Sequence, residues 1–197
     1  MLETVLLASA ASYLIGAVPF GLLFARWLTG KDPRAHGSGN IGATNAMRTG
    51  GKKVGALTLL ADILKGTIPV AAAIAFESEE LLIAAVALSA FIGHIFPVYL
   101  KFRGGKGVAT MFGVIIPWMP WVAIGSFLIW FIIFRATRYV SLASMIAGFT
   151  LPLLAWFQDM SIEAIALCLL LGGLMTARHY SNIRRLWVGT EPKTGAS

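Results

Sequence analysis

The sequence predicts an all-α, polytopic integral membrane protein with about seven transmembrane helices, its N-terminus outside and its C-terminus in the cytoplasm. Of its 197 residues, 57% are hydrophobic and only 13% are charged, and the mean hydropathy is +0.78. An ordinary soluble domain is about a quarter charged. Long apolar stretches and a one-sided distribution of basic residues complete the pattern. Seven spans leave no room for a separate soluble domain, so residues 1–197 are expected to form a single transmembrane domain.

The apolar stretches are candidate spans because about 20 apolar residues cross the hydrocarbon layer. In chain order they cover residues 4–25, 54–76, 80–100, 107–117, 121–134, 140–157 and 161–177. The fourth and fifth are short, and only Pro117-Trp118-Met119-Pro120 separates them. Proline ends helices and tryptophan favours the membrane boundary, which predicts a tight turn at the membrane surface.

The loops between these stretches divide the charge unequally. Fifteen of the 16 Lys and Arg residues lie in 26–53, 101–107, 135–138 and the tail from Arg178. The opposite loops hold Glu77, Glu79, Glu80 and Asp159, and no Lys or Arg. Basic loops are retained in the cytoplasm, which predicts the stated orientation. The net charge of +7 either enforces this topology or attracts anionic lipid headgroups.

The first basic loop, 36–48, crowds glycines among polar side chains. Glycine permits positive φ and close approach of the backbone to a ligand, and backbone N–H groups that open a helix form an anion site. Arg48 could close such a site with a bidentate contact. The candidate phosphate-binding residues are Gly37, Gly39, Asn40, Gly42, Thr44, Asn45 and Arg48, with Ser38 as a candidate catalytic residue. The alternative is a flexible linker, which needs no Asn, Thr and Arg among its glycines.

A second glycine-rich loop precedes the stretch 107–117. Gly104, Gly105 and Gly107 surround Lys106, which suggests a phosphate cradle at a helix N-terminus with Lys106 as a candidate catalytic residue. It is not a Walker A loop, because a glycine follows the lysine, and this argues against an ATPase. A basic loop that only sets topology is an equal alternative.

The tail supplies a third group of polar residues. His179 and Asn182 are three residues apart and would share a helix face as candidate catalytic residues, and Ser141 is a weaker donor toward the same side of the membrane. The alternative is that His179 is simply a hydrogen-bonded interfacial residue. No histidine pair has metal-ligand spacing with carboxylates, so neither a metal nor another cofactor is predicted.

Two charged residues lie within the second apolar stretch. Asp62 and Lys65 are costly at that depth unless they are paired, so we expect them to pair with each other and brace the bundle. A proton relay is the rarer alternative. The only cysteine, Cys168, is expected to be a packing residue.

Taken together, the three polar segments resemble the motifs of the bacterial membrane-embedded acyl-phosphate:glycerol-3-phosphate acyltransferases. Residues 38–45 with Arg48 resemble the first motif, Gly93 to Thr110 the second, and Arg178-His179 with Asn182 the third. The resemblance spans nearly the whole chain.

This resemblance implies transfer of an acyl chain from acyl phosphate to the 1-hydroxyl of glycerol 3-phosphate, giving lysophosphatidic acid and phosphate. It implies a multi-pass protein of the inner or plasma membrane with its site at the cytoplasmic face, and neither acyl-CoA nor acyl carrier protein as direct donor. The expected partners are the two substrates, membrane lipids and an upstream enzyme that makes acyl phosphate, and no nucleic acid.

The residues are compatible with that chemistry, because both substrates carry phosphate and acyl phosphate already has a good leaving group. Ser38, Arg48 and Lys106 are expected to hold phosphate oxygens. Asn182 and His179 are expected to position the hydroxyl or the carbonyl, with His179 or a substrate phosphate oxygen as the base. Two rival functions remain, a secondary transporter for organic phosphate and a non-catalytic lipid-binding scaffold. A transporter would place its site near the midplane between repeated halves, whereas these motifs gather at one surface.

Overall fold

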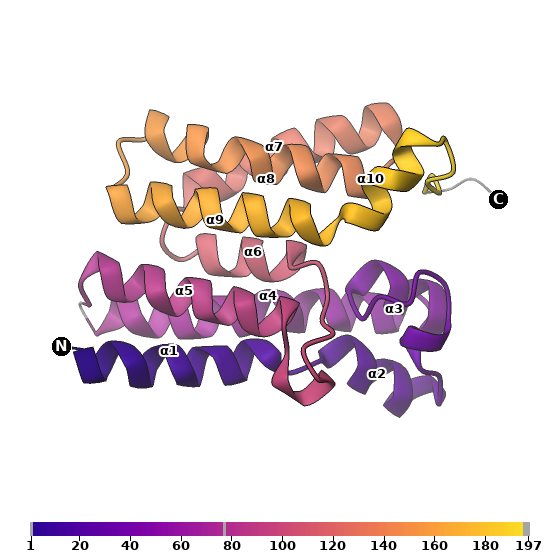
Figure 1. The fold of residues 1–197 in the computed structure, drawn as a ribbon, viewed down its shortest axis with the longest axis horizontal. Coiled ribbons are helices and arrows are strands. Elements are labelled where there is room, and N and C mark those ends of the chain that lie inside the picture. Colours follow the sequence, from indigo (N-terminus) through magenta and orange to yellow (C-terminus); the bar gives the residue numbers. More distant parts are fainter. Residues whose placement is uncertain (1, 77, 195–197) are drawn as a thin grey trace. The chain divides into compact units, whose positions relative to one another are not determined.

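The computed structural model describes residues 2–76 and 78–194, and this part of the chain is helical with no β-strand. It forms two compact units, unit 1 ending at Trp118 and unit 2 beginning at Met119 (Figure 1). An all-helical fold is therefore confirmed. That 1–197 forms one functional domain stays a prediction.

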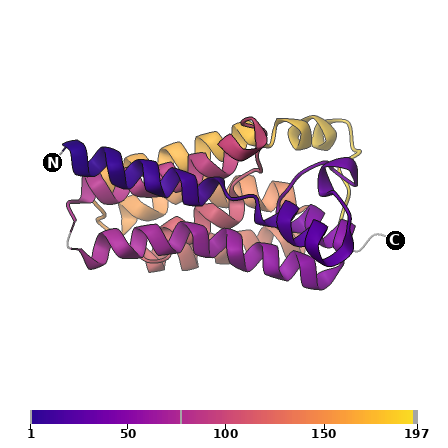
Figure 2. The same ribbon diagram turned by 90° about the horizontal axis from the view of Figure 1, so that it is seen from below.

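Unit 1 contains six α-helices and two short 3₁₀ turns. In chain order these are α1 (Leu2–Ala17), α2 (Phe20–Thr29), η1 (Pro33–Ala35), α3 (Ala43–Gly50), α4 (Lys52–Ala75), α5 (Glu80–Ile95), η2 (Val98–Leu100) and α6 (Val108–Ile115). Helices α1 and α5 pack along their lengths (Figure 2). Ser12 Oγ of α1 donates to Val86 O of α5 at 2.7 Å, and Gly16 and Gly93 lie directly against the facing backbone. Small residues with hydroxyl bonds are the usual means of close helix packing in lipid.

The predicted stretch 4–25 is not one continuous helix, because the chain breaks at Val18-Pro19 between α1 and α2. Proline cannot donate a backbone hydrogen bond and disfavours the helical conformation in the residue before it. Lys65 Nζ, from α4, donates to the Val18 carbonyl at this break at 3.0 Å.

Helix α4 is the central support of unit 1. On it lie α2 and α3, which contribute Ala25 and Ala46 to a small buried cluster with Val54. Helix α6 also packs on α4, and Thr67 Oγ1 donates to Gly113 O at 2.9 Å. The two glycine-rich loops, one before α3 and one before α6, are thus both attached to helices that α4 holds.

Unit 2 contains α7 (Pro120–Thr137), α8 (Val140–Phe157), α9 (Ile162–Arg178) and α10 (Tyr180–Trp187). Ser126 Oγ of α7 donates to Ala147 O of α8 at 3.1 Å, and Gly148 of α8 lies against Gly172 of α9. Helices α9 and α10 meet at an angle of 59°. The predicted turn between α6 and α7 is present at Ile116–Trp118.

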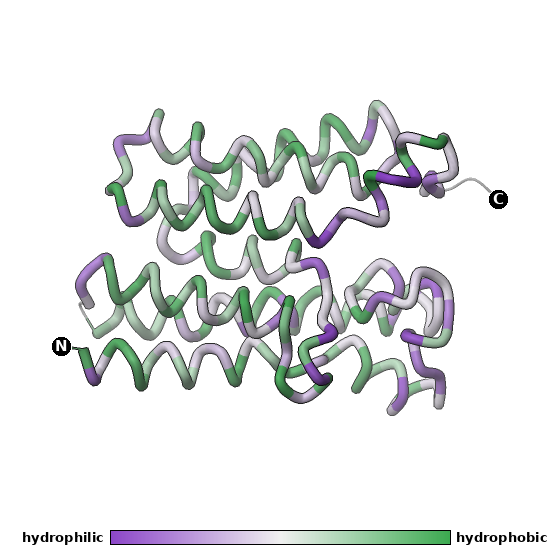
Figure 3. The backbone as a smooth tube through the Cα atoms, in the orientation of Figure 1, coloured by the Kyte–Doolittle hydropathy of each residue, from purple (hydrophilic) through white to green (hydrophobic). Residues whose placement is uncertain are grey.

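Five helical segments of the described chain are long and apolar enough to cross a membrane, or six if α9 and α10 count as one broken span. Figure 3 shows hydrophobic residues along these helices and hydrophilic residues mainly at their connections. The predicted span 107–117 corresponds to α6, whose eight residues reach only about 12 Å at 1.5 Å per residue. Seven spans and the stated orientation therefore stay predictions. Glu77, one of the predicted acidic loop residues, lies outside the described residues.

Candidate active site

The first glycine-rich loop is held in shape by the side chain of Asn45. Its Oδ1 accepts from the backbone N–H of Ser38 at 2.9 Å. Its Nδ2 donates to the carbonyls of Pro33, His36 and Asn40 at 2.8, 3.1 and 2.8 Å. Asn45 is 2% exposed. It therefore joins the first turn of α3 to the whole loop that precedes it, and we assign it a positioning role.

Two of the three glycines in this loop turn as expected. Gly37 and Gly39 have φ of 58° and 69°, whereas Gly42 has φ of −75° and is the N-cap of α3. The expectation of positive φ at Gly42 is thus wrong, because the turn into α3 is closed by Asn40 Oδ1, which accepts from Gly42 N at 2.7 Å. Asn40, like Asn45, bonds within the loop.

The side chains of this loop that point outward are those of Ser38, Thr44 and Arg48. All three are exposed, and none makes a side-chain hydrogen bond or ion pair to another described residue. Thr44 and Arg48 are four residues apart in α3 and share one of its faces. The loop thus presents two hydroxyl groups and one guanidinium group on a backbone that Asn45 holds in place. These hydrogen-bond donors are suited to binding an anion.

Asp32 secures the entry to this loop. Its carboxylate accepts from Arg34 Nη2 at 2.7 Å and from Arg26 Nη2 at 2.8 Å, and it caps η1 through Arg34 N. The hydrogen bonds from Arg34 hold the pKa of Asp32 well below its ordinary value. Arg26 and Arg34 therefore share one carboxylate, whereas Arg48 has no carboxylate partner in the described chain.

The glycines of the second loop serve packing. A side chain at Gly104 or Gly105 would collide with His94 of α5, and Gly105 N donates to His94 O at 3.1 Å. Gly107 has φ of 88° and is the N-cap of α6. Lys106 is half-buried between these glycines, directly before the N-terminus of α6. The predicted position of a lysine at a helix N-terminus is thus confirmed. His94 leaves no room for a side chain at Gly104 or Gly105, and Phe91 leaves none at Gly107.

A buried cluster of charged residues lies behind the second loop. Lys65 Nζ and Asp62 Oδ1 are 2.8 Å apart, as expected for paired residues within a span. His94 Nδ1 lies 3.7 Å from the same carboxylate oxygen. No local pattern in the sequence indicated that His94 would join this pair. Through His94 the cluster connects α4 to the loop that carries Lys106.

In unit 2, the tail carboxylate of Glu191 gathers three donors. Oε1 accepts from Ser141 Oγ and Asn182 Nδ2, each at 2.6 Å, and Oε2 accepts from Arg185 Nε at 2.7 Å. Burial raises the pKa of Glu191, but these hydrogen bonds and the charge of Arg185 outweigh it and hold the pKa below its ordinary value. Glu191 thus joins α8, α10 and the tail.

His179 and Asn182 are both buried, and the structure fixes the orientation of each. His179 Nδ1 lies 2.8 Å from Met175 O. A carbonyl only accepts, so Nδ1 carries a proton in this contact. Because Asn182 Nδ2 faces Glu191, its Oδ1 points elsewhere, and this buried oxygen has no hydrogen-bond partner within 2–76 and 78–194. Asn182 Oδ1 is therefore an acceptor suited to a hydroxyl group.

A sequence profile of the family described as glycerol-3-phosphate acyltransferase matches residues 6–189. The chain belongs to this family. Proteins named glycerol-3-phosphate acyltransferase from Bartonella quintana (strain Toulouse) and Thioalkalivibrio sulfidiphilus (strain HL-EbGR7) are each 46% identical to it. They align over 93% and 96% of this chain and 89% and 95% of their own.

Solved structures agree with this assignment to the glycerol-3-phosphate acyltransferase family. The glycerol 3-phosphate form of PlsY, an integral membrane glycerol 3-phosphate acyltransferase, superposes with a TM-score of 0.93 at 39% identity, over 98% of this chain and 96% of that one. Its lysophosphatidic acid form gives a TM-score of 0.91 at 37% identity.

Glu191, which contacts the candidate site residues Ser141 and Asn182 of this acyltransferase, was not predicted from the sequence. Its signal was nonetheless present, because Glu191 is the only acidic residue from Arg178 to the end of a tail rich in arginine and lysine. In the described part of the acyltransferase, no three His, Cys, Asp or Glu side chains are grouped so as to hold a metal ion.

Proposed function

We propose that this protein transfers a fatty acyl group from acyl phosphate to the 1-hydroxyl of glycerol 3-phosphate, releasing lysophosphatidic acid and inorganic phosphate. The observation that carries the proposal is the likeness to PlsY, at 39% identity over 98% of the chain, in its glycerol 3-phosphate form. The likeness to the lysophosphatidic acid form supports the product.

In this reaction the glycerol hydroxyl oxygen attacks the acyl carbon of the mixed anhydride. An ester C–O bond forms, the bond between the acyl carbon and the phosphate oxygen breaks, and phosphate leaves with that electron pair. The hydroxyl proton goes to a base. Catalysis then needs orientation of two anionic substrates and stabilisation of developing oxyanion charge.

The first two loops suit the phosphate groups. Ser38 and Arg48 are exposed on a loop whose backbone Asn45 fixes, and Lys106 precedes the N-terminus of α6. In the proposed roles these three side chains hold phosphate oxygens. The N–H groups of Gly37 and Gly107, the side-chain amide N–H of Asn40 and the hydroxyl of Thr44 would serve the same phosphate groups. The N–H groups of Gly39, Gly42 and Gly105 already donate to His36 O, Asn40 Oδ1 and His94 O, so in this proposal these glycines and Gly104 shape the loops.

The third group suits the hydroxyl. Asn182 Oδ1 is a buried acceptor without a partner in the described chain, and His179 lies three residues before it with Nδ1 against Met175 O. In the proposed mechanism Asn182 orients the 1-hydroxyl and His179, or a substrate phosphate oxygen, accepts its proton. Ser141 acts through Glu191, which it helps to hold. Convergence of this group with the two loops is part of the proposal.

The proposal also includes acyl phosphate as the acyl donor. It places the active site at the cytoplasmic face of the inner membrane. Acyl phosphate would come from an upstream enzyme that makes acyl phosphates. The distribution of Lys and Arg around the spans supports this location. Neither a metal nor another cofactor is part of the mechanism, because the leaving group is already activated.

The test supplies purified protein in lipid with glycerol 3-phosphate and, separately, palmitoyl phosphate, palmitoyl-CoA or palmitoyl acyl carrier protein. Stoichiometric phosphate and lysolipid from palmitoyl phosphate alone is the expected result. Product from palmitoyl-CoA or the carrier protein instead would contradict the donor. Substrate flux into sealed vesicles without product would point to a transporter.

The assigned roles are tested by Lys106→Ala and Arg48→Ala. Each should lower kcat/KM by about 100-fold or more, because a charged group at a phosphate contributes roughly 3 kcal/mol to binding the transition state. Thermal unfolding should stay close to wild type. Lys53→Ala, an exposed lysine with no ion pair in the described chain, is the matched control. Activity near wild type for Lys106→Ala would remove this residue from the site.

A further inference from the structure

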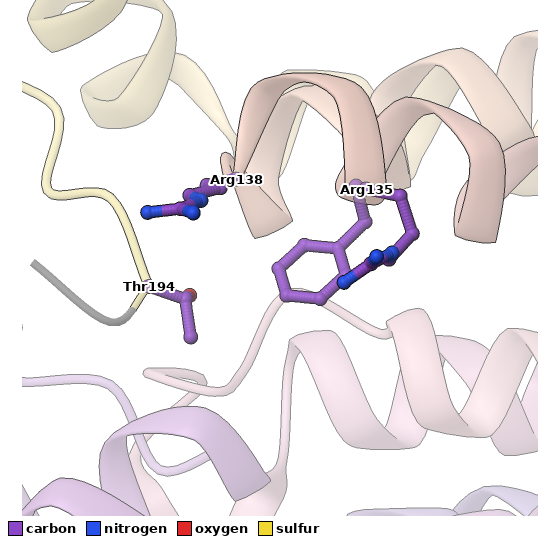
Figure 4. A pocket seen from close by; sticks show the side chains of 4 residues that line it. Arg135, Arg138 and Thr194 are labelled. Carbon is purple, nitrogen blue, oxygen red and sulfur yellow. The ribbon is translucent and has the colours of Figure 1, made fainter.

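A surface pocket lies in unit 2 where α7 ends (Figure 4). It has a volume of about 400 Å³ and is lined by Phe134, Arg135, Arg138 and Thr194. Phe134 and Arg135 belong to the last turn of α7, Arg138 is its C-cap, and Thr194 comes from the tail. None of these residues has a role in the proposed acyl transfer.

The pocket is positively charged. Arg135 and Arg138 are both exposed, and within the described chain neither guanidinium has a carboxylate partner. Figure 4 shows the Arg138 side chain extending toward the tail segment that carries Thr194. Two unneutralised arginines beside a hydroxyl form a set of donors that matches a phosphate group.

The backbone at Arg138 indicates that its side chain matters. Arg138 has φ of 60° and ψ of 12°, the left-handed conformation that ends many helices and strongly favours glycine. An arginine here has a conformational cost that glycine would avoid. The tail secures this corner, because Thr194 N donates to Arg138 O at 3.0 Å and Lys193 Nζ lies 5.3 Å from the ring centre of Tyr139.

An apolar surface leads from the pocket into the candidate span. Only 17% of the α7 window is buried, against 33–50% for the other four candidate spans, so α7 faces outward along most of its length. Phe127, Trp130 and Phe134 stack in sequence along it, with ring centroids 6.1 and 5.0 Å apart. The pocket therefore combines cationic donors at a helix end with an outward aromatic face.

We propose that this pocket binds the phosphate headgroup of an acidic phospholipid of the surrounding bilayer, with the lipid's acyl chain along the aromatic face of α7. Charge complementarity supplies the headgroup contact, since arginines at a span end lie at the depth of lipid phosphates. The apolar face favours a lipid over a free phosphate ion, which has nothing to place against aromatic rings.

The test measures lipid binding and not turnover, so its failure is separable from failure of the proposed acyl transfer. Purified protein in neutral detergent is titrated with phosphatidylglycerol, phosphatidylcholine or inorganic phosphate, and bound molecules are counted by native mass spectrometry. Wild type should retain one phosphatidylglycerol in preference to phosphatidylcholine. Arg135→Gln and Arg138→Gln should each weaken it by roughly tenfold or more, as expected for loss of one charge-assisted hydrogen bond.

Arg138→Gly is the decisive variant. It removes the guanidinium while suiting the left-handed backbone, so the melting temperature should be equal to or above that of wild type while phosphatidylglycerol binding falls. Lys52→Gln/Lys53→Gln is the control for general positive charge and should bind as wild type. Three results would overturn the proposal: phosphatidylglycerol binding by Arg138→Gly as tight as by wild type, equal retention of phosphatidylcholine, or an inorganic phosphate ion that displaces the lipid at comparable concentration.

Discussion

Glu191 brings together a hydroxyl, an amide and a guanidinium from positions 141, 182 and 185. Each of its oxygens is satisfied, and the amide of Asn182 is thereby oriented with Oδ1 left without a hydrogen-bond partner in the described chain. Asn45 has a comparable role in unit 1, where one side chain makes four hydrogen bonds to backbone groups of the first loop. At the scale of single residues, the site depends on side chains that hold other side chains or loops in position.

Replacing this carboxylate should therefore affect stability in a pH-dependent way. Glu191→Gln removes the charge that these donors stabilise, and it should lower the free energy of unfolding at pH 7 by about 1–3 kcal/mol. The pKa of Glu191 is lowered in the folded protein, so its contribution is complete above the ordinary value of 4.5 and is lost as pH falls through the folded value. Wild type and variant should thus converge in acid.

Thermal unfolding in detergent from about pH 7 to pH 3 measures this difference. Glu163→Gln makes the same change of charge at a glutamate with no ion pair in the described chain, and it should show no comparable convergence. If the melting temperatures of wild type and Glu191→Gln differed by the same amount at pH 7 and at pH 3, the stabilising role of the ionised Glu191 carboxylate would be contradicted.

At the scale of elements, hydropathy and proline predicted most helix positions, because length and polarity decide which segments can lie in lipid. The two predicted stretches 140–157 and 161–177 match α8 and α9 closely. The break at Val18-Pro19 was not predicted, since apolar residues continue on both sides of it. Nor were the contacts of His94 with Asp62 and of Glu191 with Ser141, because contacts between residues 32 or 50 positions apart leave no local pattern.

The pair within α4 offers a test at this scale. Lys65→Ala leaves the Asp62 carboxylate buried without its nearest cation, so it should lower the free energy of unfolding by about 3–5 kcal/mol. The double variant Asp62→Leu/Lys65→Met removes both charges and should recover most of that loss. Denaturation of the purified protein, compared with the exposed control Lys53→Ala, measures both effects. If the double variant were less stable than Lys65→Ala, the Asp62–Lys65 pair would contribute to stability through more than the mutual compensation of its charges.

At the scale of the whole molecule, the arrangement in the membrane is the main prediction. The single cysteine makes it accessible to labelling, because Cys168→Ser gives a background without thiols. Exposed positions at the two ends of α4, Lys53→Cys and Glu79→Cys, should lie on opposite sides of the membrane, and Lys193→Cys on the side of Lys53.

An impermeant maleimide added to intact bacterial cells should label the cysteine at 79 alone, whereas those at 53 and 193 should react only after permeabilisation. The reversed pattern would put the glycine-rich loops outside the cell, away from any cytoplasmic acyl donor. Labelling of 53 and 193 from opposite sides would instead contradict the predicted number of spans.

The position of Glu191 in the chain also has a consequence for biosynthesis. Ser141 is translated 50 residues before the carboxylate that it contacts, an interval of roughly 3 to 10 s at ordinary ribosome speeds of about 5–20 residues per second. Helices α8 and α9 are synthesised before that carboxylate exists. The polar cluster of this half of the protein therefore assembles only once the tail has been synthesised, and a stalled nascent chain that ends before the tail would contain its helices but not this cluster.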